Sequence, residues 1–314
     1  MAARERPGDP DDSCLVPRAE QGRVTGSPCL AHYTRPVPAD RIAESLAFIN
    51  WTVLTGLAVG TFAAVVAGRL FTQATKGYLA FTAFSAAGFA VLAAFADTGL
   101  PALSPVLAVR ADPTWEVPRR VALAALPVVA GVYGVALLRG HRAVPVAAAG
   151  LASAGLALIA GALSWGGGGI GSALLLVELA TLATALGGVW AAMVLGHWYL
   201  VTPRLPEAPL VRFARWLGLA LAVQLALFVA WSGVGAGPSG TPGFGALVGD
   251  WALFVWLRLL VGLVFPLIVS WAAVQTARTR SMESATGLLY INVGTIAAGT
   301  ILAAGLYFGA GLLV

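Results

Sequence analysis

Three polar side chains lie inside long apolar stretches of this sequence. They are Glu178, Gln224 and Arg258. A charged side chain at the centre of a bilayer costs at least about 2.5 kcal/mol, so such residues usually face other protein groups or a polar cavity. Counted along helices at about 1.5 Å per residue, all three reach a similar depth from one side. They predict a polar layer containing a Glu178–Arg258 pair, which either binds a quinone or other substrate or only joins helices.

An internal repeat supports this layer. The stretch 60–71 (GTFAAVVAGRLF) aligns with 188–199 (GVWAAMVLGHWY). The residues of a second match keep their spacing: Arg119, Pro127 and Arg139 recur as Arg258, Pro266 and Arg278. Arginine and proline are scarce in this chain, so the second match is the more informative one. It predicts two related halves.

The repeat places Asn50 at the position of Glu178 and Arg119 at that of Arg258. The first half therefore keeps the arginine but has an amide in place of the acid. Arg119 then needs another acidic partner, for which Glu116 is a candidate. One active and one degenerate site would give this pattern.

A second group of polar residues is expected at the opposite ends of the helices. His197 lies in GHWYLVTPRL (196–205), and Thr286, Tyr290 and Asn292 lie in ESATGLLYINVG (283–294). Together they would line a pocket for a headgroup. The alternative for His197 is an interfacial side chain that anchors a helix end. Haem is not expected, because membrane haem b usually takes two histidines inside the bundle, and no metal site is predicted.

The composition shows which elements must position these residues. Hydrophobic residues make up 59% of the 314 residues, charged residues only 11%, and the mean hydropathy is +0.84. Soluble domains carry about 25% charged residues, so the sequence predicts an all-α polytopic membrane protein with the lipid bilayer as its surroundings. The expected spans are 46–68, 78–96, 116–138, 144–165, 171–199, 209–232, 250–275 and 287–310.

The expected organisation is a disordered polar tail over 1–44, then two parallel four-helix repeats over 45–165 and 166–314. Cys14 and Cys29 lie in the tail without a CxxC or CxxCH motif, so no covalent cofactor is indicated. The sequence also contains no Walker A, HExxH or GxSxG motif.

Basic residues predict the orientation of the chain. Nine of them follow the odd-numbered spans: Arg69, Lys76, Arg139, Arg142, Arg204, Arg212, Arg215, Arg278 and Arg280. By the positive-inside rule this face is cytoplasmic, which places both termini outside an inner (plasma) membrane. Because the basic residues lie in short loops rather than in one patch, nucleic acid is not an expected partner. Tryptophans near the span ends, among them Trp51 and Trp165, are typical of an interfacial aromatic belt.

The stretch WTVLTGLAVGTF (51–62) resembles the opening helix of the NrfD and polysulfide-reductase membrane-subunit family, where an aromatic residue precedes a Gly-Leu-Ala-x-Gly stretch. That family also has eight helices in two four-helix bundles. The resemblance implies a haem-free membrane subunit of an electron-transfer complex, which binds quinone or serves as an anchor beside iron–sulfur or molybdenum subunits. The alternative function is a carrier of small molecules or ions, with a pathway between the two halves.

Overall fold

Eight long apolar helices make up most of the protein. The computed structural model describes residues 38–103, 107–202 and 205–314. Within these residues, eight helices are long and apolar enough to cross a membrane. Their bounds are α2 (Leu46–Phe71), α3 (Lys76–Thr98), α4 (Glu116–Leu138), α5 (Val144–Trp165), α6 (Gly169–Val201), α7 (Ala208–Val234), the continuous span of α8 (Ala252–Leu259), η3 (Leu260–Val264) and α9 (Phe265–Arg278), and α10 (Met282–Ala310).

All eight predicted spans are confirmed as helices, each with its ends a few residues from the predicted bounds. The prediction of a disordered tail up to residue 44 is wrong at its end, since Pro38–Glu44 forms the helix α1, which packs against α10. A built Cβ at Gly305 of α10 would lie 3.7 Å from a side-chain carbon of Ile42, so this apolar residue holds α1 there. Residues 1–37 lie outside the described part.

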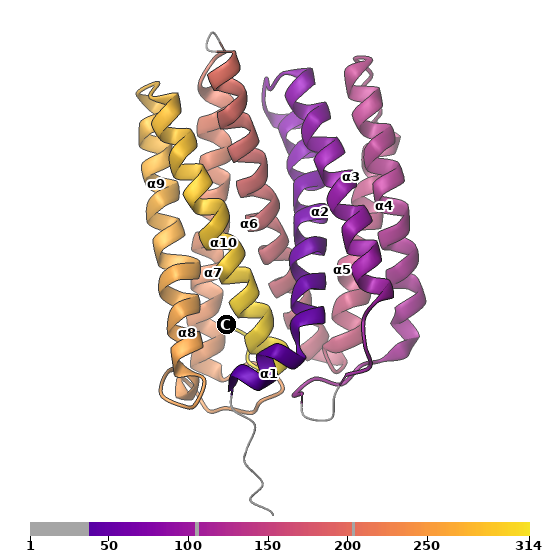
Figure 1. The fold of residues 1–314 in the computed structure, drawn as a ribbon, viewed down its shortest axis with the longest axis vertical. Coiled ribbons are helices and arrows are strands. Elements are labelled where there is room, and N and C mark those ends of the chain that lie inside the picture. Colours follow the sequence, from indigo (N-terminus) through magenta and orange to yellow (C-terminus); the bar gives the residue numbers. More distant parts are fainter. Residues whose placement is uncertain (1–37, 104–106, 203–204) are drawn as a thin grey trace, which may run out of the picture. The chain divides into compact units, whose positions relative to one another are not determined.

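The helices pack in the same order in both halves of the chain. In the first half α2, α3, α4 and α5 each contact the next, and α5 returns to α2; α6, α7, α9 and α10 do the same in the second half (Figure 1). The two halves meet through their first helices, α2 and α6, while α10 contacts α2 and α5 contacts α6. Exchanging the halves leaves these contacts unchanged, although α3 also contacts α6. The superposition of residues 45–165 on 166–314 stays a prediction.

Glycines set the separation of α2 and α6. A Cβ built at Gly60 would overlap the main chain of Ala183, and one built at Gly187 would overlap the main chain of Gly60. Gly56, one turn before Gly60, also faces Ala183. Small residues four apart let two helix backbones approach closely in a membrane. The GxxxG spacing of Gly56 and Gly60 thus positions the central contact between the halves.

Two tyrosines add hydrogen bonds across the same boundary. The Tyr78 hydroxyl of α3 donates to the Ala191 carbonyl of α6 at 2.9 Å, and the Tyr307 hydroxyl of α10 donates to the Trp165 carbonyl of α5 at 2.8 Å. Both rings are buried. Each half therefore supplies one buried donor to the other.

The seventh span changes its winding in the middle. Its segment η3 is a π-helical turn, in which the Phe265 N–H bonds to the Leu260 carbonyl. Pro266 follows directly and has no N–H to donate, which favours a local change of hydrogen-bond register. In the first half, Pro127 lies inside the continuous α-helix α4. The two proline positions therefore have different local structures.

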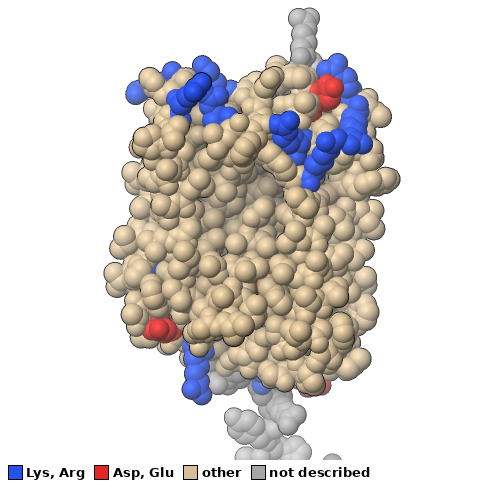
Figure 2. All heavy atoms as spheres, turned by 180° about the vertical axis from the view of Figure 1, so that it is seen from behind, with Lys and Arg blue, Asp and Glu red and all other residues tan. Residues whose placement is uncertain are grey.

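Charge is concentrated at the two ends of the bundle. Figure 2 shows Lys and Arg side chains gathered at the end that carries the loops α2–α3, α4–α5, α6–α7 and α9–α10. This end is here called the basic end, and the end that carries α1 is called the opposite end. Of the nine basic residues expected here, Arg204 lies outside the described residues. The predicted orientation depends on this concentration of basic residues at one end of the bundle.

Candidate functional site: two polar clusters at the opposite end

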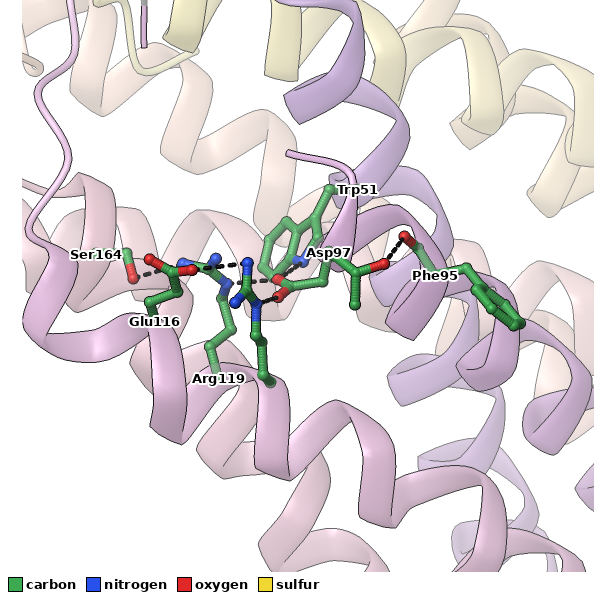
Figure 3. Close-up of polar contacts among 8 residues, drawn as sticks. Trp51, Phe95, Asp97, Glu116, Arg119 and Ser164 are labelled. Carbon is green, nitrogen blue, oxygen red and sulfur yellow. Dashed lines mark hydrogen bonds and ion pairs between the residues drawn. The ribbon is translucent and has the colours of Figure 1, made fainter. Parts of the chain in front are cut away.

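A buried ion pair forms the centre of a polar cluster in the first half. Asp97, in the last turn of α3, is 0% exposed, and Arg119, at the end of the first turn of α4, is 5% exposed. Arg119 Nε lies 2.5 Å from Asp97 Oδ1, which also accepts a hydrogen bond from Trp51 Nε1 at 2.8 Å (Figure 3). Three helices, α2, α3 and α4, thus converge on one carboxylate. The cluster neutralises the buried arginine.

The guanidinium of Arg119 also contacts α5. Its Nη1 donates to Ser164 Oγ at 2.8 Å, and its Cζ lies 4.6 Å from the centre of the Trp165 ring and 5.9 Å from that of Trp51. Cation–π contacts of this kind are favourable where water is excluded. Because Trp51 and Trp165 are almost fully buried, the interpretation as an interfacial belt is wrong for these two residues.

Glu116 is not the partner of Arg119. Its Oε1 lies 2.7 Å from Nη2 of Arg120, one turn along α4, and Arg120 Nε lies 3.4 Å from Asp97 Oδ2. The side chains of Glu116 and Arg120 are both more than 40% exposed. The predicted acidic partner is therefore corrected to Asp97. The sequence interpretation missed it because the second span was expected to end at residue 96.

A cavity of about 410 Å³ opens beside this cluster. It is lined by Phe48, Leu100, Pro101, Ala102, Leu103, Ala111, Asp112, Pro113, Glu116, Arg119, Arg120, Ser164 and Trp165. At its edge, two hydrogen bonds from Thr114 lower the pKa of Asp112; the one from the Thr114 side chain has the larger effect, and the one from the Thr114 N–H the smaller. The lining therefore combines aromatic faces, two arginines and carboxylates.

The second half has its own cluster around Arg258. Arg258 Nη2 donates to Gln224 Oε1 at 3.1 Å, Arg258 Nε donates to the main-chain oxygen of Val314 at 3.3 Å, and Gln224 Nε2 donates to the Thr181 carbonyl at 2.7 Å. Arg258 is 2% exposed. Gly262 faces Gly299 beside it, and a Cβ at Gly299 would lie 3.0 Å from Arg258 Nη1. Two glycines thus leave the space that the guanidinium fills.

The structure does not form the expected Glu178–Arg258 ion pair. Glu178 is 5% exposed, and within the described part of the chain its carboxylate forms no ion pair and its Oε1 has no hydrogen-bond partner. The Arg258 guanidinium donates a hydrogen bond to Gln224 instead. The three residues of the predicted layer are all buried, and the hydrogen bond found among them within the described residues joins Arg258 to Gln224.

The first-half counterpart of this layer differs from the predicted one. Asn50 is exposed on α2, while its neighbour Trp51 is buried and bonded to Asp97. The acid of the first half comes from its second helix, α3, and the acceptor of the second half, Gln224, also comes from a second helix, α7. The pairing of Asn50 with Glu178 is therefore wrong as a pairing of buried polar groups. Asp97 and Gln224 are the matched acceptors.

The expected headgroup pocket is not assembled. His197 and Tyr290 are exposed, whereas Asn292 is fully buried and donates to Ser270 Oγ at 2.8 Å and to the Pro266 carbonyl at 3.2 Å. Thr286 is buried against Gly196 and donates to the Met282 carbonyl. Asn292 and Thr286 therefore join helices. A role for His197 or Tyr290 stays a prediction.

Comparison with known proteins gives no family for this chain. No family model matches it, and searches of curated proteins and of solved structures find no match. The resemblance to the NrfD and polysulfide-reductase membrane subunits stays a prediction. What the eight apolar helices do support is the coarser conclusion, that the chain is an integral membrane protein.

Proposed function

We propose that this integral membrane protein binds the headgroup of a quinone in the cavity beside Asp97 and Arg119, and that it serves as the quinone-site subunit of an electron-transfer complex. The observation that carries the proposal is the lining of the cavity, which places the buried Arg119–Ser164 pair beside the flat ring of Trp165. A quinone ring needs an apolar slot and donors for its two carbonyl oxygens.

Three groups of this cavity have hydrogen-bonding capacity that suits a quinone. Ser164 Oγ accepts from Arg119, which leaves its own hydrogen to donate, and no bond donated by Ser164 Oγ is found within the described residues. Arg120 is partly exposed and carries several N–H donors. Glu116 is also partly exposed and is a group through which protons can reach a reduced quinone. The two electrons would come from an iron–sulfur or molybdenum subunit.

Calorimetric titration of the purified protein in detergent with a short-chain quinone tests this proposal. Arg120→Gln removes a charged donor, and Ala111→Phe fills the cavity; each is expected to weaken binding about tenfold or more. Ala148→Phe, on α5 at the other end of the bundle, is the matched control and is expected to leave binding unchanged. Absence of saturable binding to the wild type, or equal affinity for Ala111→Phe, would contradict the proposal.

A second candidate function is supported by Glu178. Its buried Oε1 has no partner within the described residues, and it lies about one turn of α6 before Thr181, whose carbonyl binds Gln224. A group of this kind takes up a proton or cation inside a membrane carrier. Glu178→Gln should then abolish ion uptake into proteoliposomes, measured with an internal pH dye. Glu283→Gln, an exposed acid on α10, is the control. Equal uptake by Glu178→Gln and the wild type would rule out this carrier role.

A further inference from the structure

A cavity at the basic end of the first half combines arginines with an apolar groove. Its volume is about 470 Å³, and it lies between α2 and α5, with α4 behind it. Arg69 and Arg142 line it together with Tyr133 and a set of aliphatic side chains. The aliphatic side chains are Val66, Leu70, Val144, Ala147, Ala148 and Leu151.

The groove runs along the helices into the depth of the membrane. Val144 opens α5, and Leu151 lies about 10 Å further along that helix at 1.5 Å per residue. One half of a bilayer's hydrocarbon layer is about 15 Å thick. The arginines therefore lie where lipid headgroups are, and the aliphatic wall lies where the first part of an acyl chain would be.

Within the described residues, no carboxylate pairs with the arginines of the groove. The two loops at this end of the first half, residues 72–75 and 139–143, contain no acidic residue. Within the described residues neither Arg69 nor Arg142 forms an ion pair. A Cβ at Gly140 would lie 2.8 Å from Lys76 Nζ, so the amine of Lys76 adds its charge to the second loop.

The corresponding place in the second half has different electrostatics. A cavity of about 540 Å³ there is lined by Tyr199, Leu200, Leu205 and the residues Arg280–Glu283. Arg280 Nη2 already lies 3.0 Å from Glu207 Oε2, and Glu283 adds a second carboxylate to the lining. Of these two cavities, the first-half one is therefore the one that favours an anion.

From this contrast we infer that the first-half cavity is a binding site for an anionic phospholipid, with the phosphate between Arg69 and Arg142 and an acyl chain along α2 and α5. Guanidinium groups bind phosphate oxygens with charge-assisted hydrogen bonds, and basic pockets between membrane helices bind acidic headgroups. The inference does not depend on quinone binding, since that site lies at the other end of the bundle.

Native mass spectrometry of the delipidated protein, titrated with phosphatidylglycerol or phosphatidylcholine, tests the site. The double variant Arg69→Gln/Arg142→Gln should bind phosphatidylglycerol at least about tenfold more weakly, with no change for phosphatidylcholine. The matched control is Arg215→Gln/Arg278→Gln, which removes the same charge from exposed positions at the same end. Equal losses in the two double variants would overturn the site, because net charge alone would then explain binding.

A third variant separates a lipid from a free anion. Ala148→Phe fills the groove without changing any charge, and it should weaken phosphatidylglycerol binding as the arginine variant does. Inorganic phosphate at millimolar concentration should fail to displace the lipid. If phosphate displaces it and Ala148→Phe has no effect, the cavity holds a soluble anion and the lipid assignment is wrong.

Discussion

Arg119 and Asp97 are 22 residues apart in sequence, yet they form an ion pair of 2.5 Å in which both side chains are almost fully buried. Breaking a buried pair leaves one charge uncompensated, which is costly. Asp97→Asn should therefore lower the free energy of unfolding by about 3 to 5 kcal/mol, measured by chemical unfolding in detergent.

Two comparisons make this prediction specific to burial. Asp97→Leu/Arg119→Met removes both charges and should recover much of the lost stability. Glu207→Gln breaks the exposed pair with Arg280, for which a loss below about 1 kcal/mol is expected. A loss of similar size in Asp97→Asn and Glu207→Gln would show that burial does not govern the first pair.

The central contact between the halves should be intolerant of a methyl group. Gly60→Ala places a Cβ against the main chain of Ala183, so the helices α2 and α6 must separate. We expect a loss of stability of about 2 kcal/mol or more, in the range of overpacked cores. Gly131→Ala, inside α4 with no atom beyond its own helix backbone within 4 Å of its built Cβ, should be neutral or slightly stabilising. Thermal unfolding followed by tryptophan fluorescence distinguishes the two variants, and equal midpoints would contradict the close approach.

The amide of Gln224 should contribute to stability through both of its hydrogen bonds. Gln224→Leu removes the acceptor of Arg258 and the donor to the Thr181 carbonyl. The expected loss is about 1 to 3 kcal/mol, because buried donors and acceptors lose their partners. Gln275→Leu, a glutamine near the basic end of α9, is the control and should change the unfolding free energy by less than about 0.5 kcal/mol. An unchanged free energy of unfolding in Gln224→Leu would mean that water replaces the hydrogen bonds of the amide.

The link between the loops α6–α7 and α9–α10 should weaken in acid. The pKa of Glu207 is lowered below 4.5. The largest cause is a hydrogen bond from the main-chain N–H of Glu207 itself, and the next is the positive charge of Arg280. Since the folded state has the lower pKa, the stabilisation is present above pH 4.5 and is lost as the pH falls through the lowered value. The difference in melting temperature between wild type and Glu207→Gln should therefore shrink below pH 4.5. A difference that grows on acidification would contradict this assignment.

The orientation of the chain can be tested by labelling. With Cys14 and Cys29 replaced by serine, a cysteine at Ser239, exposed in the loop after α7, should react with an impermeant maleimide from outside the cell. A cysteine at Gln73, exposed at the basic end, should react only after the membrane is opened. The reverse pattern would invert the topology.

The membrane helices were predictable because their signal is local. A run of about 20 apolar residues is visible without knowledge of its neighbours, and both turns and prolines mark the ends. The burial of Glu178, Gln224 and Arg258 followed from the same signal. Which of them touch could not be predicted, because rotation of each helix about its axis decides whether Arg258 meets Glu178 or Gln224.

The first-half cluster shows the same limit at a helix end. Asp97 is the sole acidic residue between Glu44 and Asp112, which was a usable signal. It lies one residue beyond the expected end of its span, however, and so is not among the polar residues expected inside the bilayer. The prediction that Asn50 matches Glu178 was wrong for a related reason. An alignment shifted by one residue turns a helical side chain by about 100°, which exchanges a buried position for an exposed one.

The contact between Gly60 and Gly187 has a consequence for how the protein can be assembled. The two first helices contact each other, and the linker glycines Gly167, Gly168 and Gly169 have no atoms near their built Cβ positions. A chain cut at this linker would keep the contact between Gly60 and Gly187 and both tyrosine hydrogen bonds. Residues 1–167 and 168–314, made as separate polypeptides in one cell, should therefore find each other in the bilayer and purify together, as two subunits of a dimer do.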